Sequence, residues 1–378
     1  MNVLTTLSLL LLVLYVLKIL YYKHKWEHYP ELELSGPASV KISVVIAFRN
    51  EISDLDILLV LLLSQNYPEE SYEVILVNDH SEDGSDGLVQ KFCDQHRNFR
   101  LLHNDASETG KKSAIMKGVR NATYDLIVTT DADCSLRENW LTAIAQAYQE
   151  KDADLIVGLV DMVSTDSFFG RFQEIEFLSL VAAGAGAIAA ERPIYCNGAC
   201  LAYRKSAFLA FTDPMKQKIP SGEDTLFMHE LKRKSGKRIV LAKSVQAIAT
   251  TRGASTFKDF FQQRKRWISK APYYRDSDIL YTSFLVFLVN FSVLHALILL
   301  VTGINVWLFP VMYVVKLLTD MGFLKSFLRF YCKNLPAGWF TVYELVYPFY
   351  VVLFAAAGIF SGFTWKGRRT GASFPTPT

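Results

Sequence analysis

The sequence Tyr124-Asp125-Leu126-Ile127-Val128-Thr129-Thr130-Asp131-Ala132-Asp133 joins an apolar run to two carboxylates. The β-branched run before Asp131 predicts a strand that is buried on both faces. Asp131 and Asp133 then lie where this strand meets solvent. Mg²⁺ or Mn²⁺ binds one or two such carboxylates and completes its shell with substrate phosphates, whereas an isolated Asp-x-Asp triplet also suits a solvated turn. The pattern of the neighbouring segments is needed to choose between a metal site and a solvated turn.

Segments on both sides of this stretch repeat the same alternation of strand-like and helix-like patterns. The strand-like runs cover residues 41–46, 72–77, 99–102 and 125–129, and amphipathic segments lie near 54–64, 87–96, 112–121 and 138–147. The alternation predicts an α/β domain whose first half forms a parallel sheet with helices on both faces. Ligands bind such sheets beyond the carboxyl ends of the strands.

Polar residues follow three of these predicted strands, at Arg49-Asn50-Glu51, at 78–85 and at Asp131-Ala132-Asp133. Each group alone has an ordinary explanation as a helix cap or a turn. Their recurrence at one edge of a sheet favours a binding site instead. Gly110-Lys111-Lys112-Ser113 suggests a P-loop, but position 105 is Asp where that motif requires glycine, so we exclude a P-loop.

Part of the chain is predicted to lie in lipid. The 378 residues are 51% hydrophobic with a mean hydropathy of +0.18. Thr5 to Tyr22 is long enough to cross a bilayer, and basic residues follow this run instead of preceding it. A cleaved signal peptide is the competing interpretation, but no cleavage site is evident. We therefore expect a transmembrane anchor over residues 1–25 and, by the positive-inside tendency, a cytoplasmic domain over 40–272.

Residues 278–364 are predicted to form further membrane or interfacial helices, followed by a tail over 365–378. We expect a helical hairpin over 279–318 with its turn at 303–305, an interfacial helix over 323–333, and a span over 340–360. Four crossings would place Lys366, Arg368 and Arg369 outside, against the charge rule, so we expect either that one C-terminal segment is re-entrant or that the number of crossings is not four. The apolar stretch 168–190 suits either a helix at the membrane surface or ordinary core.

Six motifs occur in order along the chain: Ile46 to Glu51, Val77 to Ser85, Gly110-Lys111, Asp131-Ala132-Asp133, Gly222-Glu223-Asp224 and Gln263-Arg264-Lys265-Arg266-Trp267. They resemble the motifs of membrane-bound family 2 glycosyltransferases, such as cellulose, chitin and hyaluronan synthases and ceramide glucosyltransferases. Two departures are Ala47, where many members have Pro, and Gly222, where processive synthases usually have Thr. The resemblance implies a GT-A (nucleotide-diphospho-sugar transferase) fold with a Rossmann-like mixed sheet, plus transmembrane helices.

The resemblance also implies roles for individual residues on the donor side. Lys111 would lie near the uracil or the diphosphate and Asp131 near the ribose, while Asp133 would bind Mg²⁺ or Mn²⁺. The residues that would line the nucleoside pocket are Ala47, Glu51 and Asp79.

On the acceptor side, the resemblance makes Asp224, beside Glu223, the general base of an inverting displacement that needs no protein nucleophile. Gln263, Arg266 and Trp267 share one face of a predicted helix and would close over the diphosphate and the acceptor. A basic interfacial helix that anchors the domain beside the bilayer is the alternative for this segment, since Arg264, Lys265 and Lys270 lie in it.

The sequence therefore predicts an integral, multi-pass membrane glycosyltransferase that acts at the cytoplasmic face, in a bacterium at the inner membrane. It would transfer a hexose from a nucleotide sugar, most simply a UDP-sugar, to a membrane lipid. A processive polysaccharide synthase is the alternative, and an inactive sugar-nucleotide-binding scaffold is a third interpretation. The net charge of +3 gives no indication of nucleic acid binding, and the five cysteines show no zinc-site or Cys-x-x-Cys spacing.

Overall fold

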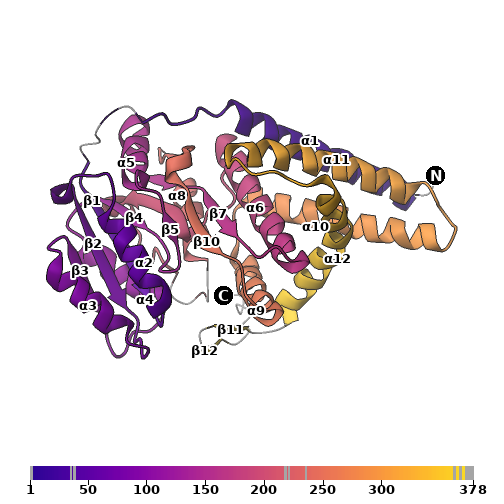
Figure 1. Ribbon diagram of the computed structural model, residues 1–378. Coiled ribbons are helices and arrows are strands. Elements are labelled where there is room, and N and C mark those ends of the chain that lie inside the picture. Colours follow the sequence, from indigo (N-terminus) through magenta and orange to yellow (C-terminus); the bar gives the residue numbers. More distant parts are fainter. Residues whose placement is uncertain are drawn as a thin grey trace.

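The computed structural model describes residues 3–34, 36, 40–216, 219, 222–234, 236–360, 363–365 and 368–370. An α/β domain lies on the left of Figure 1, and a bundle of long helices projects from it to the right. The N-terminal end of the chain lies at the far end of this bundle (Figure 1). The α/β domain and the long apolar helices thus form two adjoining regions of one molecule.

The main sheet has seven strands in the order β3-β2-β1-β4-β8-β6-β9. The first four run parallel, whereas β8 is antiparallel to both of its neighbours and β6 pairs parallel with β9. The predicted α/β class with a mixed sheet is confirmed. The strands are β1 Ile42–Phe48, β2 Tyr72–Asn78, β3 Phe99–His103, β4 Leu126–Thr129, β6 Leu155–Val157, β8 Leu201–Arg204 and β9 Ile239–Leu241.

Helices follow the parallel strands at the predicted places: α2 Ile52–Leu63, α3 Ser85–Gln95, α4 Lys111–Asn121 and α5 Trp140–Lys151. Helix α4 packs on β1 and β2. This close approach depends on Gly118, because a Cβ there would lie 2.3 Å from Val45 Cγ1. Apolar burial explains the stability of this layer, since Val44, Val45 and Ile75 are fully buried.

A second sheet, in the order β5-β10-β7, extends the domain toward the helical bundle. Its strands are β5 Ser135–Leu136, β10 Ala249–Arg252 and β7 Val160–Val163. Strand β10 leads directly into α9, Phe257–Ile268, whose N-cap Thr256 accepts a hydrogen bond from the Asp259 backbone N–H. The remaining elements of the domain are α6 Phe168–Ala189, α7 Lys205–Leu209 and α8 Glu223–Arg233. Two short strands, β11 Phe363–Trp365 and β12 Arg368–Thr370, pair antiparallel near the C-terminus.

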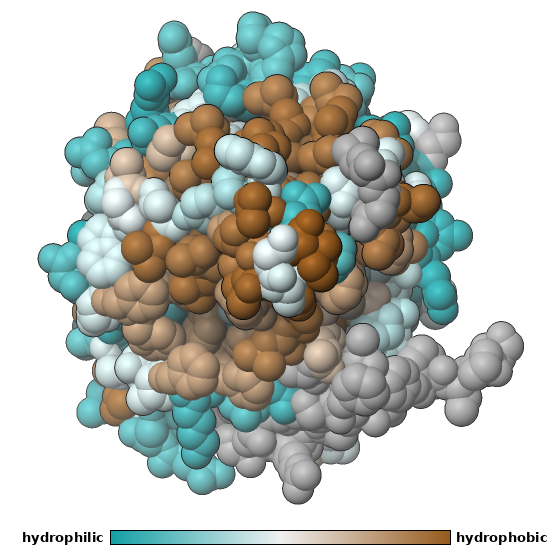
Figure 2. Space-filling model, turned by 90° about the vertical axis from the view of Figure 1, so that its right-hand side faces the viewer, coloured by the Kyte–Doolittle hydropathy of each residue, from teal (hydrophilic) through white to brown (hydrophobic). Residues whose placement is uncertain are grey.

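Three long helices form the projecting bundle: α1 Val3–His28, α10 Ser277–Val301 and α11 Leu308–Phe330 (Figure 1). Their outward faces carry exposed apolar side chains, among them Leu10, Phe284 and Val314. Figure 2 shows the end of the bundle as a hydrophobic face with hydrophilic side chains around it. Within the part of the chain that the structure describes, four helices, α1, α6, α10 and α12, are by length and composition able to cross a membrane. An exposed apolar surface of this kind suits contact with lipid.

The predicted hairpin is present, with its turn between Val301 and Leu308, but the separate interfacial helix over 323–333 is wrong. Helix α11 continues without interruption to Phe330. Phe323 and Phe327 are buried, and Trp26 of α1 packs on Phe327 with ring centroids 4.8 Å apart. Of the basic residues that suggested an interface, Lys325 and Arg329 lie on α11 away from its buried apolar side, whereas Lys333 follows the helix and pairs with Asp161 and Glu174 of the α/β domain.

Helix α12, Ala337–Phe360, runs obliquely across the bundle and ends near α9 (Figure 1). It exposes one apolar stripe that includes Trp339, Val342 and Phe349, whereas Phe340 and Tyr343 are buried. This spacing is that of a helix with one face on lipid and one on protein. Lys366, on which the predicted topological conflict partly depended, lies outside the described residues, so the number and direction of the crossings stay a prediction.

Charged side chains inside the helical region are paired. The Lys316 ammonium on α11 contacts the carboxylates of Glu344 on α12 and, at 2.9 Å, of Asp320. The Tyr15 hydroxyl on α1 donates a hydrogen bond of 2.8 Å to Asp320. Because an unpaired charge in an apolar environment is costly, these contacts join three helices at a point where the sequence alone suggests a poor membrane segment.

Candidate active site

The carboxyl ends of β1 and β2 lead into two loops that hold each other through side chains. Asn50 and His80 adopt positive φ values of 53° and 59°, which non-glycine residues rarely do. The Asn50 side chain accepts a hydrogen bond from the Glu82 N–H, and the Asn50 N–H donates to the Ser81 hydroxyl. Strained backbone that is held by side-chain hydrogen bonds is common at binding sites.

Asp79 lies at the end of β2 and is almost fully buried. Its Oδ1 accepts hydrogen bonds from the Gly110 N–H at 2.8 Å and from Asn104 at 3.3 Å. These bonds fix the loop before α4 and so position Lys111, the first residue of that helix. In the structure, Asp79 therefore orients the residues before α4.

Lys111 and Asp131 form an ion pair directly after β4. Asp133 behaves differently, because burial and the nearby charges of Asp131 and Glu51 raise its pKa to about 6. A carboxylate under this repulsion fits a divalent cation, which would relieve it, and Mg²⁺ or Mn²⁺ takes one or two protein carboxylates together with phosphates. Among the residues that the structure describes, no group of three or more His, Cys, Asp or Glu forms a ready metal site. Substrate oxygens would therefore have to supply the other ligands.

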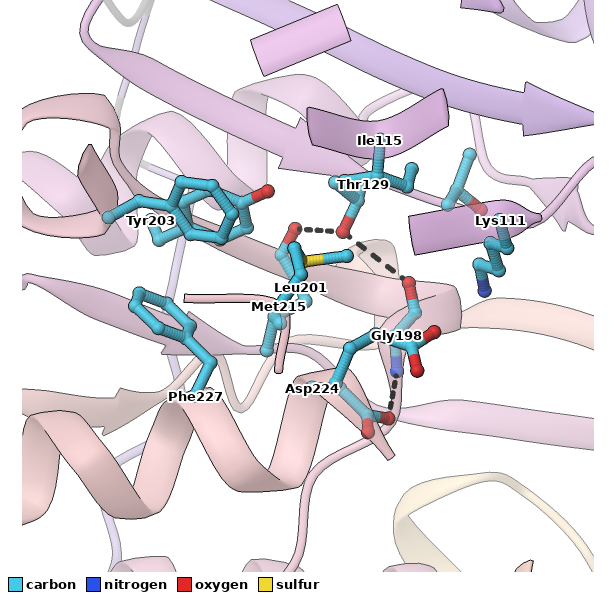
Figure 3. A pocket seen from close by; sticks show the side chains of 12 residues that line it. Lys111, Ile115, Thr129, Gly198, Leu201, Tyr203, Met215, Asp224 and Phe227 are labelled. Atoms are coloured by element: carbon cyan, nitrogen blue, oxygen red, sulfur yellow. Dashed lines mark hydrogen bonds between the residues drawn. The ribbon is translucent and has the colours of Figure 1, made fainter. Parts of the chain in front are cut away.

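Asp224 occupies the first turn of α8, opposite Lys111 in Figure 3. Its Oδ2 accepts a hydrogen bond of 2.9 Å from the Gly198 N–H, which Figure 3 marks with a dashed line. Glu223, one residue earlier, lies 4.0 Å from the Lys112 ammonium. Burial raises the pKa of Glu223, but Lys111 and Lys112 outweigh burial and lower this pKa overall. The Asp224 carboxylate is thus held by a backbone N–H, whereas Glu223 interacts with the charges of Lys111 and Lys112.

A polar cavity of about 140 Å³ lies between these elements. Eight of the eleven predicted site residues line it: Lys111, Asp131, Asp133, Glu223, Asp224, Gln263, Arg266 and Trp267. Ala47, Glu51 and Asp79 lie at the adjoining ends of β1 and β2 and do not line this cavity. We call it the donor-side cavity.

Helix α9 contributes Gln263, Arg266 and Trp267 to the donor-side cavity. Arg264, which lies between them in sequence, is buried, and its Nε donates a 3.0 Å hydrogen bond to Glu176 on α6. The interpretation of Arg264, Lys265 and Lys270 as basic interfacial side chains is wrong, because all three are buried. The structural reason is that α12 packs along α9 and that Glu176 of α6 pairs with Arg264. The aromatic rings against the Arg264 guanidinium, Phe260 and Trp267, belong to α9 itself.

A second cavity, of about 480 Å³, extends from α9 into the helical region. We call it the membrane-side cavity. Its walls come from α1, α6, α9, α10, α11 and α12 and are mainly apolar. Four residues line both cavities: Asn197, Asp224, Trp267 and Lys270. The two cavities therefore adjoin at these four residues, and Asp224 is the carboxylate among them.

Sequence reasoning missed Asn197 and Gly198 and misjudged Lys270. Asn197 caps a short turn over 198–200, and its side chain accepts a hydrogen bond from the Ala199 N–H. The Asn-Gly pair is an ordinary turn signal, so nothing in it indicated that Gly198 would hold Asp224. Lys270 was predicted to flank the membrane, because a sequence does not reveal which lysines are covered by distant helices.

The chain matches one protein-family model and is similar to several known proteins. Residues 43–210 match the family Glycosyl transferase family 2. The chain is 28% identical over 120 residues to Glycosyltransferase AglE of Haloferax volcanii, which is 32% of this chain and 39% of that protein. It is 33% identical over 117 residues to Glycosyltransferase GlyG of Streptococcus pneumoniae serotype 4, covering 31% and 38%.

A third relative is the poly-beta-1,6-N-acetyl-D-glucosamine synthase of Staphylococcus epidermidis, 26% identical over 141 residues, which cover 37% of this chain and 33% of that enzyme. The chain thus spans less than two fifths of the length of these three relatives. They and the family match support a family 2 glycosyltransferase, whereas the predicted similarity to ceramide glucosyltransferases stays a prediction.

Among solved structures, the mannosyltransferase PcManGT from Pyrobaculum calidifontis, in complex with GDP-Man and Mn²⁺, superposes with a TM-score of 0.58 at 16% identity. The match covers 95% of this chain and 99% of that one. The likeness extends over the helical region as well as the α/β domain, and the fold is GT-A.

Proposed function

We propose that this protein is a metal-dependent, inverting glycosyltransferase that moves a hexose from a nucleotide sugar to a hydroxyl group of a membrane lipid. The observation that carries the proposal is that the polar donor-side cavity and the mainly apolar membrane-side cavity meet at Asp224. A general base has to lie between donor and acceptor, and Asp224 is the carboxylate that faces both cavities.

The donor side has the chemistry that a nucleotide diphosphate needs. Asp133 would hold Mg²⁺ or Mn²⁺ against the diphosphate, and the cation would neutralise charge on the leaving group. Arg266 and Lys111 would add positive charge from the cavity wall, while Asp131 would hold Lys111 and face the ribose. Glu51, Asp79 and Ala47 would border the nucleoside. We propose a UDP-sugar as the donor. A GDP-sugar is the alternative donor, because the mannosyltransferase PcManGT, which is similar in fold, was solved with GDP-Man.

Transfer would then proceed in one displacement. The acceptor oxygen forms a bond to the anomeric carbon on the face opposite the diphosphate, and the bond from that carbon to the phosphate oxygen breaks. The electron pair leaves with the nucleotide diphosphate, and the acceptor proton passes to Asp224. Two backbone hydrogen bonds would keep the Asp224 carboxylate in place during this step: the Gly198 N–H donates to Oδ2 at 2.9 Å, and the Thr225 N–H donates to Oδ1 at 2.7 Å. Glu223 would help to set the local charge.

The acceptor is proposed to be a lipid because the membrane-side cavity is formed by helices with lipid-type exteriors. Leu180, Val286 and Phe323 supply apolar wall on three different helices. Such a wall suits a hydrocarbon chain better than a hydrated sugar chain. The reaction would take place at the cytoplasmic face, with residues 1–25 as an anchor, 40–272 as the catalytic domain and 278–364 as the lipid-facing helices.

A processive polysaccharide synthase is the second candidate. The relative named poly-beta-1,6-N-acetyl-D-glucosamine synthase favours it, and so do the tyrosines that line the membrane-side cavity, Tyr343, Tyr347 and Tyr350. Aromatic rings with hydroxyl groups can stack on and hydrogen-bond to sugars. The inactive scaffold is the least favoured of the three functions, because it does not explain why a candidate base and a candidate metal ligand line the same cavity.

One experiment separates these functions. The purified full-length protein in detergent is incubated with Mn²⁺, a panel of radiolabelled UDP- and GDP-sugars and total membrane lipid. A labelled lipid of discrete mobility on thin-layer plates supports the proposal, whereas a labelled polymer in the void volume of a size-exclusion column supports the synthase. Absence of transfer from every donor, with nucleotide binding retained, would leave the scaffold. Asp224→Asn serves as the inactive control.

A further inference from the structure

Lys270 is a buried cation at the junction of the two cavities. It follows α9, is 8% exposed and lines both the donor-side and the membrane-side cavity. Among the described residues its ammonium forms no ion pair within 4.0 Å. Its near neighbours are instead the ring of Tyr195, with the centroid at 5.6 Å, and the side chain of Tyr274. A buried charge without a carboxylate partner is costly unless a ligand supplies the counter-charge.

The lysine is charged in this position. Burial lowers the pKa of the Lys270 ammonium, but Tyr274 and the more distant carboxylate of Asp224 outweigh burial and raise this pKa overall. Two lysines elsewhere in the chain have direct carboxylate partners: the partly buried Lys232 pairs with Asp276 at 2.8 Å, and the buried Lys316 pairs with Asp320 at 2.9 Å. Lys270 differs from them because its charge points toward cavity space.

The backbone before Asp224 is shaped to admit this side chain. Gly222 has a φ of +81°, and a Cβ at this position would lie 2.2 Å from Lys270 Cδ. A side chain at position 222 would therefore collide with the lysine stem in its present position. Gly222 thus leaves the space through which the Lys270 side chain reaches the cavities.

The residues around Lys270 indicate whether its ammonium faces the donor or the acceptor. The donor-side cavity has its own basic residues, Lys111 and Arg266, neither of which lines the membrane-side cavity. Tyr195 and Tyr274, the aromatic neighbours of Lys270, line the membrane-side cavity alone. The other guanidinium or ammonium group in that wall is Arg264, and Glu176 neutralises it. Lys270 is thus the cation that remains to meet an acceptor.

We propose that Lys270 binds a phosphate group of the acceptor, so that the acceptor is a lipid that carries both a phosphate and the hydroxyl group that is glycosylated. This inference rests on the proposed function for the identity of the reacting hydroxyl, but the binding of a lipid phosphate is a separate property. The phosphate would lie at the mouth of the membrane-side cavity, with the lipid chain among the helices and the hydroxyl directed to Asp224.

The test compares two lipids with identical chains, dioleoyl phosphatidic acid and dioleoylglycerol, which differ in the phosphate. Their binding to the full-length protein in detergent is measured by native mass spectrometry for the wild type, Lys270→Gln and Lys270→Arg. We expect the wild type to prefer phosphatidic acid. Loss of a charge-assisted hydrogen bond in Lys270→Gln should weaken phosphatidic acid about tenfold or more and leave dioleoylglycerol unchanged, while Lys270→Arg stays within a few-fold.

Two controls keep the result specific. Lys325→Gln removes a basic side chain on α11 that lines neither cavity, and it should leave the preference unchanged. Lys270→Met provides a second neutral variant of similar length in case glutamine disturbs the fold, which thermal melting will reveal. Binding of UDP with Mn²⁺, measured by calorimetry, should not change in Lys270→Gln.

Three results would overturn the inference: an unchanged preference in both neutral variants, an equal loss for both lipids, or weaker UDP binding with intact lipid binding, which would assign the cation to the donor. None of these measurements needs turnover. If instead lipid binding follows Lys270 but Asp224→Asn still transfers sugar at the wild-type rate, the proposed function fails while the phosphate site stands.

Discussion

The donor-side and membrane-side cavities share Asp224 but use charge in opposite ways. In the donor-side cavity, burial is the largest cause that raises the pKa of Asp133 to about 6, and the nearby charges of Asp131 and Glu51 add to it. In the wall of the membrane-side cavity, the carboxylates of Asp320 and Glu344 both contact the Lys316 ammonium. A charge without a direct partner of opposite sign is available for a ligand, and a charge that is paired across two helices joins them. Lys270 lies at the boundary and follows the first pattern.

The largest expected effect removes the group that both cavities share. Asp224→Asn keeps the hydrogen-bonding shape of the side chain but cannot accept the acceptor proton, so kcat should fall by about 10²- to 10⁴-fold. UDP affinity, measured by calorimetry with Mn²⁺, should stay within a few-fold of the wild type. Glu230→Gln, on the outer side of the same helix, is the matched control. Equal loss of nucleotide binding and turnover would assign Asp224 to the donor instead.

The paired charges of the helical region should matter for stability instead of chemistry. Lys316→Met leaves Asp320 and Glu344 without their cation, and breaking a buried pair costs about 3–5 kcal/mol. The expected result is a lower melting temperature of the full chain in detergent. The double variant Lys316→Met/Glu344→Gln should recover part of the loss, because it removes the uncompensated carboxylate. No recovery would show that the pairing is not what Lys316 contributes.

The donor-side carboxylates should instead make metal binding depend on pH. Because protons compete with the cation at Asp133 below its pKa of about 6, the affinity for Mn²⁺ in the presence of UDP should fall up to about tenfold per pH unit below pH 6. Calorimetry at pH 7.5, 6 and 5 measures this. In Asp133→Ala, metal-dependent nucleotide binding should be lost at every pH.

The same carboxylate gives a stability test without metal. The pKa of Asp133 is raised in the folded state, so its ionisation opposes folding once the pH exceeds the unfolded value, and the full penalty is present above about pH 6. Metal-free Asp133→Asn should therefore melt above the wild type at pH 7.5, and the difference should disappear near pH 4. A wild type that melts higher at pH 7.5 would contradict the raised pKa.

The smallest expected effect comes from reducing the membrane-side cavity. Ala183 lines it from α6, and Ala183→Phe would fill part of the space without adding charge. The KM for the lipid acceptor should rise several-fold while the KM for the nucleotide sugar stays the same, since the donor-side cavity does not include Ala183. Ala145→Ser in the core of the α/β domain is a control for small packing changes. A change in donor KM alone would separate this cavity from the acceptor.

The amino-acid sequence by itself determined the α/β alternation, the acidic ends of β2 and β4, and the helix starts that present Lys111 and Asp224. These features are local: a strand end and the turn after it are fixed by residues close together in the chain, so periodicity and turn chemistry reveal them. The hairpin of α10 and α11 was also predicted, because its apolar length and its Gly-containing turn are local signals.

Only the tertiary structure decided which charges are buried and where the cavities lie. Arg264 and Lys270 look like solvent-facing neighbours of a membrane until Glu176, Tyr195 and Gly222 are placed around them from distant parts of the chain. The membrane-side cavity has walls from six helices whose contacts no sequence window contains. Burial depends on how whole elements pack, and the electrostatic role of a lysine depends on burial, so that role is a property of the assembled fold.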